Sequence, residues 1–262
     1  MRIDAARHAA RLGLAYEGPC TGGEIGAGYV RWPDGRRGVL SEGNPASTPL
    51  LGLARAAGIP APSYDLIDGR VVVQSLLPGR PPERVDQRLV DEMTAVSRRF
   101  AGLLRATEVP PLHLYLHQPG PGFCHHDSLA QYSARSAALL SSIRRVALDT
   151  LPGDDLVHVD FHPGNVLVAP DGALTGIVDW DGAGRGTRAF DLVTLLFYVC
   201  RRAPALAPPL AAEAARLAPP EVLEACWAHM SLRQVDWSIR FHDPAEADAW
   251  LAVAENPPAD LR

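Results

Sequence analysis

Residues 158–181, HVDFHPGNVLVAPDGALTGIVDWD, constrain the fold of this chain more than any other segment. An apolar run, VLVA, is followed by the turn residues Pro-Asp-Gly, and a second apolar run then leads to Asp179. This pattern predicts two antiparallel strands joined by a tight turn. We expect the hairpin to bring Asn165 and Asp179 side by side, because each lies at the same end of its strand. Asp160 precedes them on a loop.

The polar side chains of this segment are suited to phosphoryl transfer. Asn165 and Asp179 offer the oxygen ligands that Mg²⁺ prefers, and Asp160 is left to orient or deprotonate an attacking hydroxyl. His158 begins a His-x-Asp-x-x-x-x-Asn pattern, which is the spacing of kinase catalytic loops, where a metal-binding Asp follows later. The pattern therefore predicts Asp160 as a catalytic residue and Asn165 and Asp179 as metal ligands.

Composition narrows the class of protein. With 262 residues and 47% hydrophobic content, the chain can form one large or two smaller lobes. No apolar run is long enough to predict a membrane span, and the start lacks the pattern of a signal peptide, so we expect a cytoplasmic protein. A net charge of −5 argues against nucleic acid as a partner. The expected partner is a small-molecule substrate, and the protein is expected to be a monomer or a homodimer.

The chain contains no lysine, so all 25 of its basic residues are arginine. P-loop nucleotide hydrolases need a lysine in their phosphate loop, and Schiff-base enzymes need the lysine amine. Both classes are therefore excluded. The four cysteines show no Cys-x-x-Cys spacing, which argues against a zinc knuckle.

Periodicity and turn residues predict a strand-rich first part and a helical second part. Helices are predicted over 3–15 and 49–57 and strands over 35–41, 63–67 and 71–75, whereas later helices are predicted over 84–107, 127–149 and 191–202, with two more after residue 220. We therefore predict an α+β fold with two lobes. The first, residues 1–76, is a nucleotide-binding β-sheet with one helix. The second, residues 77–262, carries the catalytic loop and the substrate site.

A nucleotide would lie between such lobes, where ligand sites often occur. Gln74, Ser75 and Leu77 follow the last predicted strand and are expected to meet the base through their backbone groups. Gly23 belongs to the glycine-rich stretch TGGEIGAGYVRW, whose amides could approach phosphates. A flexible hairpin is the simpler interpretation of that stretch.

The chain resembles the aminoglycoside phosphotransferase and choline kinase family of small-molecule kinases. The stretches TGGEIGAGYV, RAAGIPAP, VVVQSLLPGRPP, HVDFHPGNVLV and GIVDWDGAGRGTRAFDLV occur in the family's order and span about residues 20–195. The resemblance implies a protein-kinase-like fold, ATP or GTP as phosphate donor and Mg²⁺ as cofactor. It implies that Asp160 is catalytic, that His162 contacts the transferred phosphate, and that His158 and Asp191 have structural roles, Asp191 bracing the loop from the next helix.

The sequence departs from the family at the third strand, where Ser41 stands in place of the expected basic residue. The partner glutamate is also missing from the next predicted helix. Losing this pair would remove charge stabilisation from a phosphoryl-transfer site. Arg37, on the same strand face as Ser41, and Arg55 are candidate replacements. Two interpretations stay open: an active kinase with a rearranged nucleotide site, and a relative that binds a ligand without phosphorylating it.

The acceptor is expected to be a small cationic hydroxyl compound, such as an aminoglycoside or a peptide antibiotic. Asp181, Asp236 and Trp237 are the candidate contacts, and Glu246 and Asp248 are further acids that a solvated helix face would explain equally well. A metabolite such as an amino alcohol, amino acid or sugar is the alternative.

Two alternatives to this assignment involve other metal sites. The run FCHHD (residues 123–127) could hold a metal, but adjacent histidines point in different directions and zinc needs three or four convergent ligands. A metal-dependent hydrolase would use His158, Asp160, His162 and Asp179. The position of Asn165 fits phosphoryl transfer better.

Overall fold

The computed structural model describes residues 3–20 and 26–261, which fall into two compact units. The first unit runs to Glu83 and also includes Pro163–Ala183, and the second combines Arg84–His162 with the residues from Gly184 onward. The bounds of these units differ from those of the predicted lobes, 1–76 and 77–262, and the lobes stay a prediction.

The first unit is built on an antiparallel sheet of five strands in the order β1-β2-β3-β5-β4. The strands are β1 (Ala15–Pro19), β2 (Gly28–Arg31), β3 (Arg37–Glu42), β4 (Tyr64–Asp68) and β5 (Val71–Ser75). β2 and β3 form a hairpin in which Arg31 faces Arg37, and β4 and β5 form another in which Asp68 faces Val71. The second turn contains Gly69, whose φ of 62° explains the glycine there.

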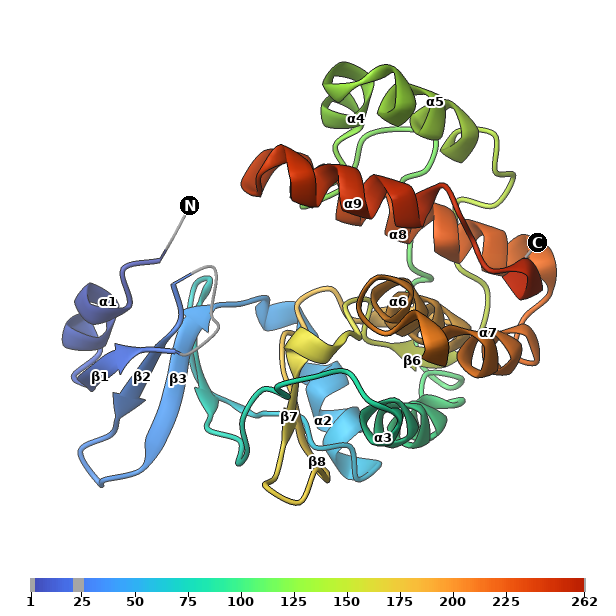
Figure 1. The fold of residues 1–262 in the computed structure, drawn as a ribbon. Coiled ribbons are helices and arrows are strands. Elements are labelled where there is room, and N and C mark those ends of the chain that lie inside the picture. The colour runs from blue at the N-terminus through green and yellow to red at the C-terminus, as the bar shows by residue number, and fades with distance from the viewer. Residues whose placement is uncertain (1–2, 21–25, 262) are drawn as a thin grey trace. The chain divides into compact units, whose positions relative to one another are not determined.

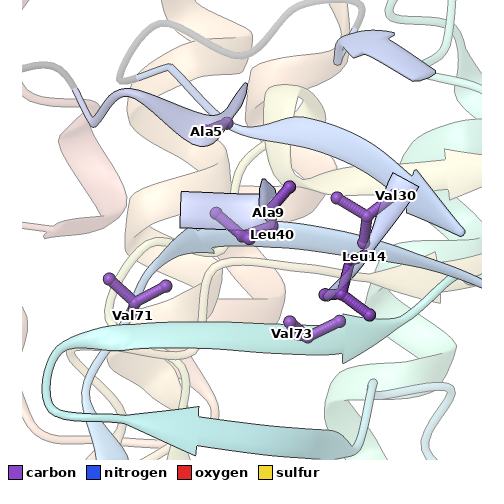
Figure 2. Close-up of a cluster of buried hydrophobic side chains, with 7 residues drawn as sticks. All are labelled: Ala5, Ala9, Leu14, Val30, Leu40, Val71 and Val73. Atoms are coloured by element: carbon purple, nitrogen blue, oxygen red, sulfur yellow. The ribbon is translucent and has the colours of Figure 1, made fainter. Parts of the chain in front are cut away.

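Helix α1 (Ala5–Arg11) begins at Asp4, whose side chain caps it by accepting a hydrogen bond from the Arg7 backbone amide. Ala5 and Ala9 are four residues apart and so share a helix face. Figure 2 shows this face against apolar side chains of the sheet, and the cluster comprises Ala5, Ala9, Leu14, Val30, Leu40, Val71 and Val73. One hydrophobic cluster of this unit therefore lies between α1 and the sheet.

The hairpin predicted from residues 158–181 is present in the first unit as β7 (Val166–Val168) and β8 (Leu174–Ile177). It is joined to the rest of the unit by backbone hydrogen bonds, since the Ile177 amide donates to the carbonyl of Pro60 and Arg80 pairs with Val168. Helix α2 (Thr48–Ala56) and the short 3₁₀ helices η1 (Pro45–Ser47) and η3 (Pro163–Asn165) complete the unit.

The second unit is mostly helical (Figure 1). It contains α3 (Gln87–Ser97), α4 (His126–Tyr132), α5 (Ala134–Ile143), α6 (Ala189–Arg202), α7 (Ala207–Ala215), α8 (Pro220–Phe241) and α9 (Pro244–Ala254), with 3₁₀ helices η2 (Arg98–Phe100), η4 (Pro204–Leu206) and η5 (Ala259–Leu261). A two-stranded sheet pairs β6 (Asp155–Val157) with β9 (Gly184–Gly186). α6 packs against α7, α8 and α9, and most of its side chains are buried.

Two predicted helices are shorter than expected. The helix predicted over 84–107 ends in the 3₁₀ turn Arg98–Phe100. The helix predicted over 127–149 is divided at Ser133, whose extended backbone and reciprocal capping box with Ser136 start a new helix. No helix in the described ranges is long and apolar enough to span a membrane.

Candidate active site

The loop before the hairpin follows β6 and is held by a carboxylate from α6. Asp191 accepts hydrogen bonds from the backbone amides of His158, at 2.9 Å, and of Val159, at 3.0 Å. Val159 has φ of 76°, a left-handed conformation that is costly for a β-branched residue. Asp191 thus fixes the backbone immediately before Asp160.

Asp191 is fully buried, and this burial raises the pKa of its carboxyl to about 7, although the two backbone hydrogen bonds act in the opposite direction. The nearby carboxylates of Asp160 and Asp155 add to the increase. His158 is also fully buried, with its ring 6.0 Å from that of Phe161. Both side chains are therefore in the protein interior, and solvent does not reach them.

Asp160 lies between two basic side chains. Its Oδ2 is 3.0 Å from Nη2 of Arg233 on α8, and its Oδ1 is 3.4 Å from Nε2 of His162. Burial opposes ionisation, but the charge of Arg233 and the interaction with His162 outweigh it and hold the pKa of Asp160 well below its usual range. The carboxylate is therefore ionised at neutral pH.

His162 is oriented by an aromatic contact. Its ring stacks on Tyr198 of α6, with 4.2 Å between centroids and an interplanar angle of 8°. The Tyr198 hydroxyl in turn donates to the side-chain oxygen of Gln234 on α8, at 2.8 Å. These contacts hold His162, and with it the loop that carries Asp160, against α6 and α8.

In the first unit, Asn165 and Asp179 lie at the open end of the β7–β8 hairpin. The Val178 amide donates to the carbonyl of Asn165 at 2.9 Å, so Asp179 is the residue next to this pair. Asp179 has φ of 64°, where the strand ends and the chain turns. The amide oxygen and the carboxylate are hard donors, so the pair fits a Mg²⁺ ion by its chemistry. The chain passes from the second unit to the first between His162 and Pro163.

Asp181 has a different environment from the one predicted for a substrate contact. Its Oδ1 accepts hydrogen bonds from the backbone amide of Asn44, at 2.9 Å, and from the hydroxyl of Tyr64, at 3.0 Å. The Asn44 side chain also donates to the Asp181 carbonyl, at 3.1 Å. Burial and the Asp181 charge raise the pKa of Tyr64, so the phenol stays protonated as the donor. Asp181 therefore links the segment after Asp179 to β4 and to the loop after β3.

Three of the residues predicted to bind the nucleotide lie on β5 or just after it. The side-chain amide of Gln74 donates to the hydroxyl of Ser41 at 2.8 Å, so this serine, at the position expected to carry a basic residue, is tied to β5. The Ser75 hydroxyl accepts from the Ser63 amide at 2.9 Å, and Leu77 is half-buried over Gly176 of β8. Gly23 lies outside the described residues.

Arg37 does not stand beside Ser41 as a replacement cation. Its guanidinium bonds to Glu17 of β1 at 2.7 Å and lies over the ring of Tyr29 at 5.5 Å. The side chain is 46% exposed, so this is a surface ion pair across the sheet. The charge that the family places at Ser41 is therefore not supplied by Arg37 in this structure.

Asp236 is fully buried, which corrects its predicted role as a substrate contact. Its carboxylate pairs with Arg240 at 2.8 Å and accepts from the Ser128 hydroxyl at 2.6 Å and the His125 amide at 3.1 Å. These bonds give it a structural role between α4 and α8. Trp237 is half-buried, and its ring packs against Phe123 at 4.7 Å and Phe241 at 4.3 Å.

The run FCHHD does not form a metal centre. His126 is buried and bonds to the Tyr115 carbonyl and to Arg144, whereas His125 is exposed. Burial raises the pKa of the Cys124 thiol to about 11, so it is not a thiolate ligand. Within residues 3–20 and 26–261, no group of three or more His, Cys, Asp and Glu side chains is arranged to hold a metal ion.

Sequence reasoning missed Arg233, Tyr64 and Asn44. Arg233 is one of 25 arginines and lies 74 positions after Val159, and Tyr64 lies 117 positions before Asp181. No local spacing connects residues so far apart. Tertiary contact alone identifies them.

Comparison with known proteins places this geometry in a family. The sequence profile described as "Phosphotransferase enzyme family" matches residues 42–227, and no curated protein sequence matches. Among solved structures, aminoglycoside phosphotransferase APH(4)-Ia, in a ternary complex with ADP and hygromycin B, is 18% identical over 96% of each chain, with a TM-score of 0.62.

Two other solved structures show the same fold. Macrolide 2′-phosphotransferase MphH from Brachybacterium faecium is 20% identical over 98% of this chain and 99% of that one, with a TM-score of 0.52. Amicoumacin kinase hAmiN, in complex with AMP-PNP, Ca²⁺ and Ami, is 15% identical over 98% and 95%, with a TM-score of 0.62. These similarities confirm the predicted α+β, kinase-like fold class.

Proposed function

Since this chain belongs to the phosphotransferase enzyme family, we propose that it transfers the γ-phosphoryl group of ATP or GTP to a hydroxyl of a small molecule. The observation that carries the proposal is the placement of Asp160. It follows a backbone segment fixed by Asp191, and its carboxylate is held ionised beside Arg233. A carboxylate kept charged on a braced loop is what positioning of a hydroxyl nucleophile requires.

In the proposed reaction, the acceptor oxygen forms a bond to the γ-phosphorus while the bond from that phosphorus to the bridging oxygen breaks. The nucleoside diphosphate leaves with the electron pair of that bond, and the hydroxyl proton passes to Asp160. Because the low pKa makes Asp160 a weak base, its main contribution is to orient the hydroxyl, with proton transfer late in the reaction. His162, 3.4 Å from Asp160, is assigned to the transferred phosphate.

Asn165 and Asp179 are the residues that would hold Mg²⁺. When bound, the ion neutralises charge on the nucleotide phosphates. The hairpin contributes the position of these two oxygen donors, because the Asn165 carbonyl at the start of β7 bonds to the residue before Asp179. Gln74, Ser75 and Leu77 remain the proposed contacts of the base.

The acids predicted to receive a cationic acceptor have partners within the protein. Asp181 and Asp236 accept hydrogen bonds from other residues of the chain, and Glu246 pairs with Arg201 at 2.9 Å. The expectation of an aminoglycoside or another cationic antibiotic therefore has no support from these carboxylates. The proposal is limited to a small hydroxyl compound, and metabolites and antibiotics are both included.

Binding without phosphorylation is the second candidate, and the replacement of the basic residue by Ser41 favours it. The two are separated by thermal unfolding with Mg²⁺ and either ATP or GTP, because a ligand that binds only the native state raises its stability. A shift with either nucleotide supports the kinase. The absence of a shift at millimolar nucleotide with Mg²⁺ supports the binding protein.

Asp160→Ala tests the catalytic assignment. We expect the variant to keep the thermal shift with nucleotide but to lose phosphate transfer in a panel of hydroxyl compounds assayed with [γ-³²P]ATP. Asp260→Ala, which removes an exposed acid of η5, is the matched control and should leave transfer unchanged. Normal turnover by Asp160→Ala would refute the role of this carboxylate.

A further inference from the structure

Arg233 makes two polar contacts with the loop that carries Asp160. On α8, its guanidinium donates from Nη1 to the carbonyl oxygen of Val159 at 3.0 Å and pairs through Nη2 with Oδ2 of Asp160 at 3.0 Å. The side chains of Arg233 and Asp160 are only 17% and 21% exposed. The contact is therefore shielded from solvent, where a charged hydrogen bond is stronger than on the surface.

Together with Asp191, Arg233 holds the backbone of Val159 from both sides of the residue. The Val159 amide donates to Asp191 of α6, and its carbonyl accepts from Arg233 of α8, so side chains from two helices hold both polar atoms of this one residue. Val159 has a left-handed φ of 76°. A strained conformation of this kind persists only when the surrounding structure fixes it from several sides.

We infer that Arg233 is a positioning residue for phosphoryl transfer: it fixes the conformation of Val159 and holds the Asp160 carboxylate by one planar guanidinium. The inference rests on the proposed function. The planar fork of arginine can meet a carbonyl and a carboxylate together, whereas the single ammonium of lysine is a point charge without this geometry.

The charge of Arg233 has a second effect on the same carboxylate. Asp160 faces Arg233 on α8 and the imidazoles of His162 and His158 on its own loop. Arg233 is the permanent cation of this set, because arginine does not lose its proton in proteins. Removing it would take the permanent positive charge away from a half-buried carboxylate, and the carboxyl would bind a proton at higher pH.

An ion pair with a purely structural role would also be shielded from solvent. The test must therefore measure a property of the Asp160 carboxyl itself. Arg233→Met keeps most of the aliphatic stem and removes the charge. Arg240→Met is the matched control, because Arg240 lies on the same helix and pairs with a different carboxylate, that of Asp236. The first readout is the titration of Asp160, followed by NMR in protein with [¹³C]carboxyl-labelled aspartate and assigned with Asp160→Asn.

We expect Arg233→Met to raise the midpoint of the Asp160 titration and Arg240→Met to leave it unchanged. An unchanged midpoint and chemical shift in Arg233→Met would overturn the inference. This readout needs neither nucleotide nor acceptor, so its result is separate from that of the proposed function, whose failure would appear as the absence of a thermal shift with ATP and GTP.

The second readout is phosphate transfer. Misplacement of a catalytic group by about 1 Å can cost on the order of a hundred-fold in rate, so kcat in Arg233→Met should fall by roughly ten- to a hundred-fold with KM for nucleotide unchanged. The acid limb of its pH profile should move to higher pH. Arg233→Lys should restore the pH profile more than kcat. A fall in kcat with a rise in the KM for nucleotide, without a change in the pH profile, would show a purely structural role.

Discussion

The hydroxyl of Tyr64 donates a hydrogen bond to the carboxylate of Asp181 at 3.0 Å, linking β4 to the chain two residues after Asp179. This bond joins segments 117 positions apart in the sequence. Tyr64→Phe removes the hydroxyl and leaves the ring. Because the acceptor is charged and partly buried, we expect a loss of about 1–2 kcal/mol in the free energy of unfolding, measured with urea. Tyr16→Phe, at an exposed tyrosine of β1, should change it by much less. Equal effects of the two variants would contradict the role of the bond.

Asp179→Asn should weaken the binding of Mg²⁺-nucleotide. The substitution removes the negative charge from one of the two proposed metal ligands and keeps the size of the side chain. Calorimetric titration should show an affinity lower by on the order of ten- to a hundred-fold with Mg²⁺, and a much smaller change without it. Asp171→Asn, in the turn at the other end of the same hairpin, is the control. Unchanged affinity in Asp179→Asn would remove this residue from the metal site.

The raised pKa of Asp191 predicts a pH dependence of stability. The carboxyl has a pKa of about 7 in the folded protein and an ordinary value of 3.8, so the folded state binds the proton more tightly. Stability from this group is therefore highest below about pH 4 and falls as the pH rises towards 7, by at most about 1.4 kcal/mol for each pH unit.

Asp191→Asn cannot titrate and should lack this part of the decline. Urea unfolding of both proteins at intervals from pH 5 to pH 8 measures it, since the other titrating groups contribute to both. The stability of the unsubstituted protein relative to the variant should decrease up to about pH 7 and then become constant. Parallel curves would show that the Asp191 pKa is not raised.

Val159→Gly should cost less stability than an ordinary valine-to-glycine change. A left-handed conformation costs a non-glycine residue about 1–2 kcal/mol, and glycine adopts it without this penalty. Val168 of β7 is also half-buried but is not among the residues with positive φ, so Val168→Gly is the matched control. We expect Val168→Gly to lower the free energy of unfolding by about 1–2 kcal/mol more than Val159→Gly. The opposite order would show that Val159 is not strained.

The β7–β8 hairpin was predictable from sequence because residues close together in the chain determine it. The turn Pro170-Asp171-Gly172 and the apolar runs around it determine a hairpin, and the hairpin determines that Asn165 and Asp179 share an end. The fold class followed from the order of strand-like and helix-like patterns. These inferences need no knowledge of distant contacts.

The parts that were missed depend on contacts across the chain or on weak local signals. The capping box of Ser133 and Ser136 divides a helix whose alanine-rich sequence otherwise predicts a continuous element. Asp236 resembled a substrate contact until the structure placed Arg240, one helical turn later, against its carboxylate. For an acidic residue on an apolar helix, the sequence does not distinguish a buried structural role from a role in binding.

The sequence profile of the family ends at residue 227, whereas α8 continues to Phe241 and carries Arg233 beyond that limit. Asp160, the proposed catalytic residue, thus lies inside the matched segment, and its counter-ion Arg233 lies outside it. A chimera that received only residues 42–227 would inherit the carboxylate without the arginine, and its host helix would have to supply a cation. A relative that lacks a cation at this position should lose activity at a higher pH, as the acidity rises, than one that has it.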